Sequence, residues 1–263
     1  MKRWLPLALL AALSACYSMP KDEYRATDSD AIKERTEFGE VVLSRVTPTL
    51  WMHTSYLDLP GIGPIASNGL IVLREDDAVL VDTAWTEPQT GDILRYAAAV
   101  LDRPIRAAVI THFHQDKMGG IGALHRAGVD TWAHALTNEL APSVDFEPAK
   151  NTIAFGASGF ATRPATAALG PLKLFYPGPG HTSDNITVQP QPGVAFAGCL
   201  IKGADARSLG NLSDADVANY ADAARSFGNA FPDASIIMMS HSAPAGREAI
   251  RHTMRMAEQV AKR

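Results

Sequence analysis

The chain has 263 residues, of which 46% are hydrophobic and 20% are charged. This composition is typical of a globular protein and excludes wholesale disorder, and the length fits one or two ordinary domains or one large α/β domain. The net charge of -4 leaves no basic surplus to bind a phosphate backbone, so we expect no nucleic-acid partner, and two cysteines are too few for a disulfide framework.

The N-terminal segment has the features of a processing signal, which we place at residues 1–15. A short basic start precedes an almost unbroken apolar run, Trp4 to Ala15, that is too short to span a bilayer. The run ends in LSA before Cys16, which resembles a bacterial lipoprotein signal. That resemblance implies cleavage before a diacylated Cys16 and, because Tyr17 follows rather than Asp, anchoring to the outer membrane in the periplasm. The alternative is an ordinary cleaved signal with an incidental cysteine.

Residues 16–40 are polar and mixed in charge, and we interpret them as a lipidated tether. No long linker, repeat or second apolar run interrupts the sequence that follows. The simplest organisation is therefore one domain over residues 41–263.

The domain alternates between β-type and helical patterns. The predicted strands span residues 40–45, 50–56, 70–73, 78–82, 107–111, 172–176, 185–189, 194–198 and 235–240. The predicted helices span residues 86–101, 118–127, 134–141, 213–228 and 245–261. Strands interleaved with helices predict layered α/β sheets with helices outside, although the strand order is not fixed by this pattern.

Three local features refine this outline. Thr86 can cap the first helix, and Pro88 is tolerated in its first turn. Residues 107–111, AAVIT, are short and apolar, as a strand buried on both faces would be. Residues 57–64 are too rich in Pro and Gly for a strand interior, so we predict a hairpin loop or flap there.

Two histidines and an aspartate directly follow the AAVIT strand. His112, His114 and Asp116 stand at i, i+2 and i+4, so their side chains fall on one side of an extended segment. Imidazole and carboxylate are both zinc ligands. A single histidine is more often an ordinary core or surface residue, but this triple spacing after a buried strand predicts a metal site.

Three more donors each follow a β-type run: His181, Cys199 and His241. Cys199 alone would more often be a small buried hydrophobe, but an acylated Cys16 leaves it no disulfide partner in the chain. Three histidines can hold one zinc with a hydroxide, while Asp116, Cys199 and His241 can hold a second. This surplus over one structural zinc predicts a two-metal hydrolytic site. The remaining histidines receive no role: His53, His125, His134 and His252.

At these residues the chain resembles subclass B1 metallo-β-lactamases, most closely the New Delhi type. The segments that carry the resemblance are HFHQDKMGG, YPGPGHTSDNITV, GCLIK, SLGNLSDAD and MSHSAP. The HxHxD element alone marks a larger hydrolase superfamily, whose other members usually have His after the Asp and a bridging Asp; here Lys117 and Cys199 take those places. The resemblance runs from about residue 40 to 260. It implies an αββα sandwich of two mixed β-sheets with helices on the outer faces and the site at one edge.

The resemblance also implies a role for each motif residue. The first zinc would be held by His112, His114 and His181, and the second by Asp116, Cys199 and His241. Lys202 would pair with the substrate carboxylate, Asn211 would lie near the β-lactam carbonyl, and Asp116 would also orient the nucleophile. Asp82 would be a buried aspartate that supports the site, and residues 57–65 would form a mobile loop over the bound drug.

The implied activity is hydrolysis of the β-lactam amide bond of penicillins, cephalosporins and carbapenems by a zinc-bound hydroxide, which confers antibiotic resistance. We expect two Zn²⁺, a small-molecule β-lactam substrate, a membrane contact through lipidated Cys16 and a monomer. Two alternatives stay open: another exported zinc hydrolase of this fold, and a non-catalytic, lipid-anchored zinc-binding protein. Departures from the family pattern at Ile62, Pro64 and the Gln189–Gly193 turn bear on relative activity against different drugs.

Overall fold

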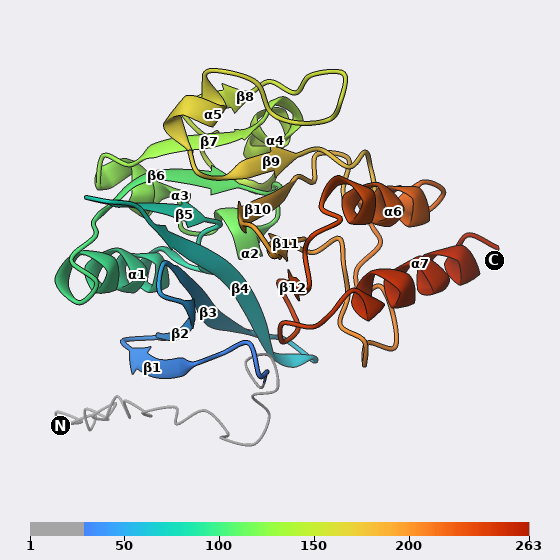
Figure 1. Ribbon diagram of the computed structural model, residues 1–263, viewed down its shortest axis with the longest axis horizontal. Helices are drawn as coiled ribbons and strands as arrows, with labels where there is room; N and C mark the ends of the chain where they lie inside the picture. The colour runs from blue at the N-terminus through green and yellow to red at the C-terminus, as the bar shows by residue number, and fades with distance from the viewer. Residues whose placement is uncertain (1–28, 263) are drawn as a thin grey trace, which may run out of the picture.

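The computed structural model describes residues 29–262 (Figure 1). The predicted signal peptide and the predicted lipidation site at Cys16 lie outside these residues, as does the first part of the predicted tether. Within residues 29–262, no helix combines the length and apolar character needed to cross a membrane.

The larger sheet has eight strands that lie side by side in chain order. They are β1 (Glu34–Phe38), β2 (Val41–Thr47), β3 (Leu50–Leu59), β4 (Gly63–Leu73), β5 (Ala78–Val81), β6 (Ile105–Ile110), β7 (Asp130–His134) and β8 (Asn151–Ile153). The pairs from β1 to β5 are antiparallel, whereas those from β5 to β8 are parallel. The sheet is therefore mixed, and its central strands β5 and β6 are almost entirely buried, as their apolar sequences predict.

The smaller sheet has four strands in the order β12-β11-β10-β9. They are β9 (Lys173–Phe175), β10 (Thr187–Gln191), β11 (Val194–Phe196) and β12 (Ile236–Met238). β11 and β12 run parallel, while β9 and β11 run antiparallel to β10. This sheet is also mixed.

The two sheets face each other across one apolar core. Alternate residues of β3 to β6, such as Met52 and Val109, pack there against Val188 and Phe196 of the smaller sheet. The helical segments of residues 29–262 are α1 (Glu87–Ala99), α2 (Gln115–Met118), α3 (Ile121–Arg126), α4 (Ala135–Leu140), η2 (Ala141–Val144), α5 (Ala165–Ala168), α6 (Tyr220–Ala230) and α7 (Glu248–Val260).

Helices cover the outer face of each sheet. α1 and α3 share a second apolar cluster with β2, β3 and β5, and α6 and α7 share a third with β11 and β12. Figure 1 shows α6 and α7 on the opposite side of the molecule from α1. The predicted αββα sandwich is therefore confirmed.

Most of the predicted elements lie close to their predicted positions. α1 is an example. Thr86 is its N-cap and accepts a hydrogen bond from the Gln89 N–H, and Pro88 lies in the first turn. Where residues 118–127 were predicted as one helix, Gly119 and Gly120 separate two short ones, α2 and α3. A Cβ at Gly119 would collide with the Trp85 carbonyl, so glycine there allows the turn to pack closely.

Three predictions need correction. Residues 34–38 form β1, which pairs with β2, so the domain begins before residue 41 and the predicted tether was too long. Residues 57–59 and 63–64 belong to β3 and β4, so the predicted flap is the tip of a long hairpin that turns at residues 60–62. The helix predicted over 213–228 begins only at Tyr220.

Candidate metal centre

Every predicted ligand lies just beyond the end of a strand. His112 and His114 follow β6, and Asp116 is the second residue of α2, which begins at Gln115. His181 follows β9, Cys199 follows β11 and His241 follows β12. Backbone hydrogen bonds join these loops, from Ile186 N to Thr111 O at 2.9 Å and from Ser240 N to Gly198 O at 3.0 Å. The two sheets thus bring all six donors to one edge of the sandwich.

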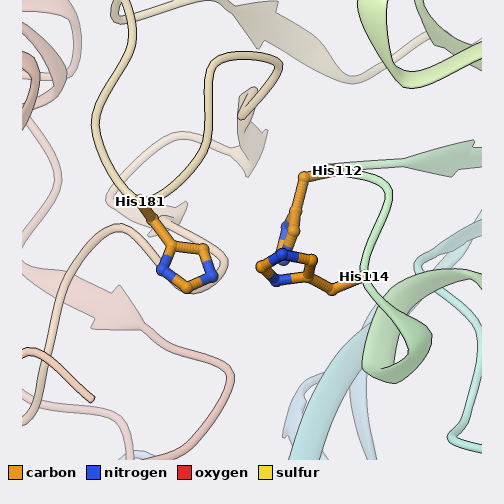
Figure 2. A group of neighbouring side chains, drawn as sticks. All are labelled: His112, His114 and His181. Carbon is orange, nitrogen blue, oxygen red and sulfur yellow. The ribbon is translucent and has the colours of Figure 1, made fainter. Parts of the chain in front are cut away.

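Three imidazole rings converge at this edge from two loops (Figure 2). His112, His114 and His181 each offer one ring nitrogen within 4.8 Å of the others. His112 is 1% exposed and its Nε2 has no hydrogen-bond partner. Burial and the neighbouring imidazoles hold the pKa of His112 and His181 well below the usual range. His112 and His181 are therefore neutral, and an unpartnered buried nitrogen such as His112 Nε2 is suited to a metal ion.

The third imidazole of this set is oriented by a carboxylate. His114 Nε2 lies 3.1 Å from Asp214 Oδ2, and Asp214 also accepts a hydrogen bond from the Ser213 hydroxyl. A histidine that donates one ring nitrogen to a carboxylate keeps the other as a lone-pair donor. Nδ1 of His114 is therefore the nitrogen available to a metal.

Asp116, Cys199 and His241 form a second, equally tight set. The Cys199 Sγ is 3.4 Å from Asp116 Oδ2 and 3.3 Å from His241 Nε2, and the last two atoms are 3.4 Å apart. His241 Nδ1 lies 2.6 Å from the Ala66 carbonyl oxygen, so Nδ1 donates and Nε2 keeps its lone pair toward the set. His112 and Asp116 lie within reach of Cys199 as well, which makes the two sets neighbours.

A buried lysine lies beneath the second set. Lys117 Nζ is fully buried, 3.1 Å from Asp116 Oδ2 and 2.8 Å from the Ser67 hydroxyl. Burial alone would lower the pKa of Lys117, but the Asp116 and Asp82 carboxylates raise it, so the lysine is charged. Burial alone would raise the pKa of Asp116, but the charge of Lys117 holds it well below the usual range. Asp116 is therefore ionised, as a carboxylate must be to act as a metal ligand.

The predicted support from Asp82 corresponds to a definite set of contacts. Its side chain is wholly buried and accepts hydrogen bonds from the Thr111 N–H at 2.7 Å and the Thr111 hydroxyl at 2.9 Å. Burial raises the pKa of Asp82 to about 7, opposed by Lys117, whose Nζ is 3.8 Å away. Asp82 thus fixes the residue that precedes His112.

The surroundings of Cys199 suit a thiol that binds a cation. Gly198, with φ +56°, turns the chain just before it, and the thiol is 3% exposed. Burial and the Asp116 carboxylate raise the pKa of Cys199 to about 12, so the thiol keeps its proton unless a cation replaces it. The first set offers three imidazoles, and the second offers a carboxylate, a thiolate and an imidazole. These donors fit two zinc ions.

Lys202 and Asn211 lie on the loops around these sets. Lys202 is partly buried, burial lowers its pKa, and its N–H donates to the Thr253 hydroxyl. Asn211 is exposed, with Oδ1 accepting from Ser213 N, and it stands three residues before the Asp214 that contacts His114. The structure places the Asn211 loop beside the histidines but shows no contact between Asn211 and them.

The contacts of Asp214, Ser67 and the Ala66 carbonyl were not predicted. Asp214 lies in the SLGNLSDAD segment, yet it is 100 residues from the histidine it orients. Ser67 and Ala66 lie in a strand with no metal-binding motif. These contacts form only when the two sheets pack together, so local sequence patterns do not predict them.

The model of the Metallo-beta-lactamase superfamily matches residues 62–241. A metallo-beta-lactamase type 2 of Bacteroides fragilis is 30% identical over 84% of this chain and 86% of its own length. A crystal structure of a metallo-beta-lactamase from Erythrobacter litoralis, with beta-mercaptoethanol in the active site, is 56% identical and superimposes with a TM-score of 0.85 over 86% of this chain and all of its own. The mono-zinc form of FIM-1 from Pseudomonas aeruginosa is 41% identical, with a TM-score of 0.80 over 86% of this chain and 98% of its own.

Proposed function

The chain belongs to the metallo-beta-lactamase superfamily, and on that premise we propose that it is a two-zinc β-lactamase of subclass B1, of the New Delhi type. Its substrates are penicillins, cephalosporins and carbapenems, whose β-lactam amide bond it hydrolyses. The observation that carries the proposal is the adjacency of two donor sets. One set has three imidazoles, and the other has the Asp116 carboxylate, the Cys199 thiol and the His241 imidazole. A single structural zinc would need only four of these donors.

The two sets would hold the metal ions separately. The first zinc would be held by His112, His114 and His181, and the second by Asp116, Cys199 and His241. When bound, zinc acts as a Lewis acid and lowers the pKa of a coordinated water toward about 7, which makes a nucleophile available at neutral pH.

The chain's own side chains complete the chemistry. Asp116, kept ionised by Lys117, can accept a proton from the attacking water and orient it. The Lys202 ammonium offers the positive charge that the substrate carboxylate needs. The Asn211 carboxamide can turn its N–H group to the lactam carbonyl oxygen as negative charge develops there. Because no serine nucleophile is needed, no covalent acyl-enzyme forms.

The cellular setting follows from the N-terminal segment. We propose that cleavage before Cys16 and acylation of that residue anchor a monomeric enzyme to the outer membrane. An enzyme facing the periplasm meets β-lactams before they reach their targets and confers resistance. Substitution Cys16→Ala should release the protein into the soluble periplasmic fraction, and unchanged membrane association would contradict the anchor.

Carbapenem ring opening is the direct test of the activity. Purified residues 17–263, which include all described residues, are assayed by absorbance with zinc, after chelation with EDTA, and after zinc is restored. We expect activity that is lost on chelation and regained with about two zinc ions per chain. If a folded, zinc-loaded sample leaves carbapenems, penicillins and cephalosporins intact, the proposal fails. Turnover of a thioester, lactone or phosphodiester would then favour another hydrolase of this fold. Zinc binding without turnover of any substrate would favour a non-catalytic zinc-binding protein.

A further inference from the structure

A buried aspartate links the two loops that carry the three histidines. Asp184 lies three residues after His181 and is fully buried. Its Oδ2 accepts a hydrogen bond from the Phe113 N–H at 2.9 Å and another from the Thr137 hydroxyl at 2.7 Å. Phe113 stands between His112 and His114. One carboxylate therefore connects the loop of His181 directly to the backbone between the other two histidines.

The link crosses from one sheet to the other. Phe113 follows β6 of the larger sheet, whereas Asp184 lies between β9 and β10 of the smaller sheet. Thr137 adds a third element, α4, which holds the carboxylate from a second direction. In Figure 2 the His181 ring approaches the His112 and His114 rings from a separate loop, so their spacing depends on how the two loops are joined.

The Asp184 carboxyl group is held by hydrogen bonds rather than by a basic side chain. Within residues 29–262, none of the salt bridges involves Asp184. Its second oxygen, Oδ1, is buried with no hydrogen-bond partner in the protein. A buried, unpaired carboxylate is costly for folding.

We propose that Asp184 is a positioning residue, which holds the loops of His181 and His112 at the spacing that one metal ion requires. This inference rests on the proposed function, because it assumes that the three histidines bind a metal. Asp184 touches no substrate and acts only through Phe113 and Thr137. Its loss should weaken metal binding at the three-histidine set and spare the Asp116–Cys199–His241 set, whose ligands it does not contact. If Asp184 only stabilised the fold, its loss would weaken metal binding at both sets alike.

Cobalt(II) distinguishes the two sets by spectroscopy. Cobalt bound to Cys199 gives a thiolate charge-transfer band, whereas cobalt on the three histidines contributes only visible ligand-field bands. The metal-free protein is titrated with cobalt(II), and both bands are followed for the parent, Asp184→Ala, Asp184→Asn and Thr137→Val. Asp92→Ala is the matched control, because Asp92 is also a buried aspartate that accepts a backbone N–H, from Glu40 at 2.9 Å, away from the metal sets.

We expect Asp184→Ala to weaken cobalt binding at the three-histidine set about 10- to 100-fold, with the thiolate band titrating as in the parent. Asp184→Asn should retain most of the affinity, because the amide oxygen can still accept from Phe113. Thr137→Val should weaken binding about fivefold, since one hydrogen bond is lost. Asp92→Ala should match the parent at both sets.

Three results would overturn the inference. They are parental affinity at both sets in Asp184→Ala, equal weakening of both sets, and parental behaviour of Thr137→Val. If Asp184→Ala does not fold, Asp184→Asn and Thr137→Val serve as the test. The same comparison of the thiolate band with the ligand-field bands is then made for these two variants. Failure of the proposed function looks different, because the parent itself would then bind no cobalt at the three histidines.

Discussion

The His114 Nε2 atom lies 3.1 Å from Asp214 Oδ2, although the two residues are 100 positions apart in the chain. The contact fixes which nitrogen of His114 carries the proton and so leaves Nδ1 to the three-histidine set. It also ties the loop that holds Asn211 to the metal centre. Metal binding and the placement of Asn211 are therefore connected through one hydrogen bond.

Substitution Asp214→Ala should lower zinc affinity at the three-histidine set by about 10- to 100-fold, because the imidazole loses the acceptor that orients it. Competition with a chromophoric chelator measures the change. Asp216→Ala is the matched control, because Asp216 lies in the same loop and its carboxylate bonds only to Asn219. Equal zinc affinity in the parent and Asp214→Ala would contradict the orienting role.

Replacement of the buried lysine should destabilise the fold. Lys117→Met removes the cation that faces Asp116 at 3.1 Å and Asp82 at 3.8 Å, and it leaves two buried carboxylates without a counter-charge. We expect a loss of about 3–5 kcal/mol in the free energy of unfolding, measured by urea denaturation of the metal-free protein. Lys117→Arg keeps the charge and should lose less. A loss below about 1 kcal/mol in Lys117→Met would show that the carboxylates do not depend on it.

Lys202 should act on substrate binding more than on turnover. Lys202→Ala is expected to raise KM about tenfold or more with little change in kcat, if the contact with the carboxylate is equal in the ground and transition states. The methyl ester of the same β-lactam, which lacks the negative charge, should show no such loss. Lys173→Ala, an exposed lysine at the start of β9, is the control for general charge. An equal effect on acid and ester would rule out the ion pair.

His53 should make folding stability depend on pH. Burial, together with the charge of Lys117, lowers the pKa of His53 from 6.5 to about 3. The unfolded chain therefore binds a proton below pH 6.5 while the folded protein does not, so the free energy of unfolding falls as pH falls. The contribution is about 1.4 kcal/mol for each pH unit between 6.5 and 3.

This slope can be isolated by comparing the parent with His53→Gln. The other buried histidines add the same slope to both proteins, so the difference belongs to His53. Urea denaturation of the metal-free proteins from pH 7 to pH 5 should give a shallower loss in His53→Gln. Parallel curves would show that His53 is protonated in the folded state or that it does not contribute.

Local patterns predicted many of the elements. The N-cap at Thr86 and the apolar AAVIT run were sufficient to locate α1 and β6, because their signals lie within the elements themselves. β1 was missed because its sequence, ERTEF, is polar and mostly exposed at the edge of the sheet. Residues 57–64 were predicted as a loop because Pro and Gly disfavour strands locally. In the folded protein, pairing between β3 and β4 outweighs that preference.

The identity of the donors and their positions after strands were predictable from the sequence, because residue type and spacing within a segment are local properties. The groups that orient these donors could be found only in the folded protein. Asp214 on His114, the Ala66 carbonyl on His241 and Asp184 on Phe113 join segments far apart in the chain. Such contacts depend on how two sheets pack across a common core, and no local pattern encodes that arrangement.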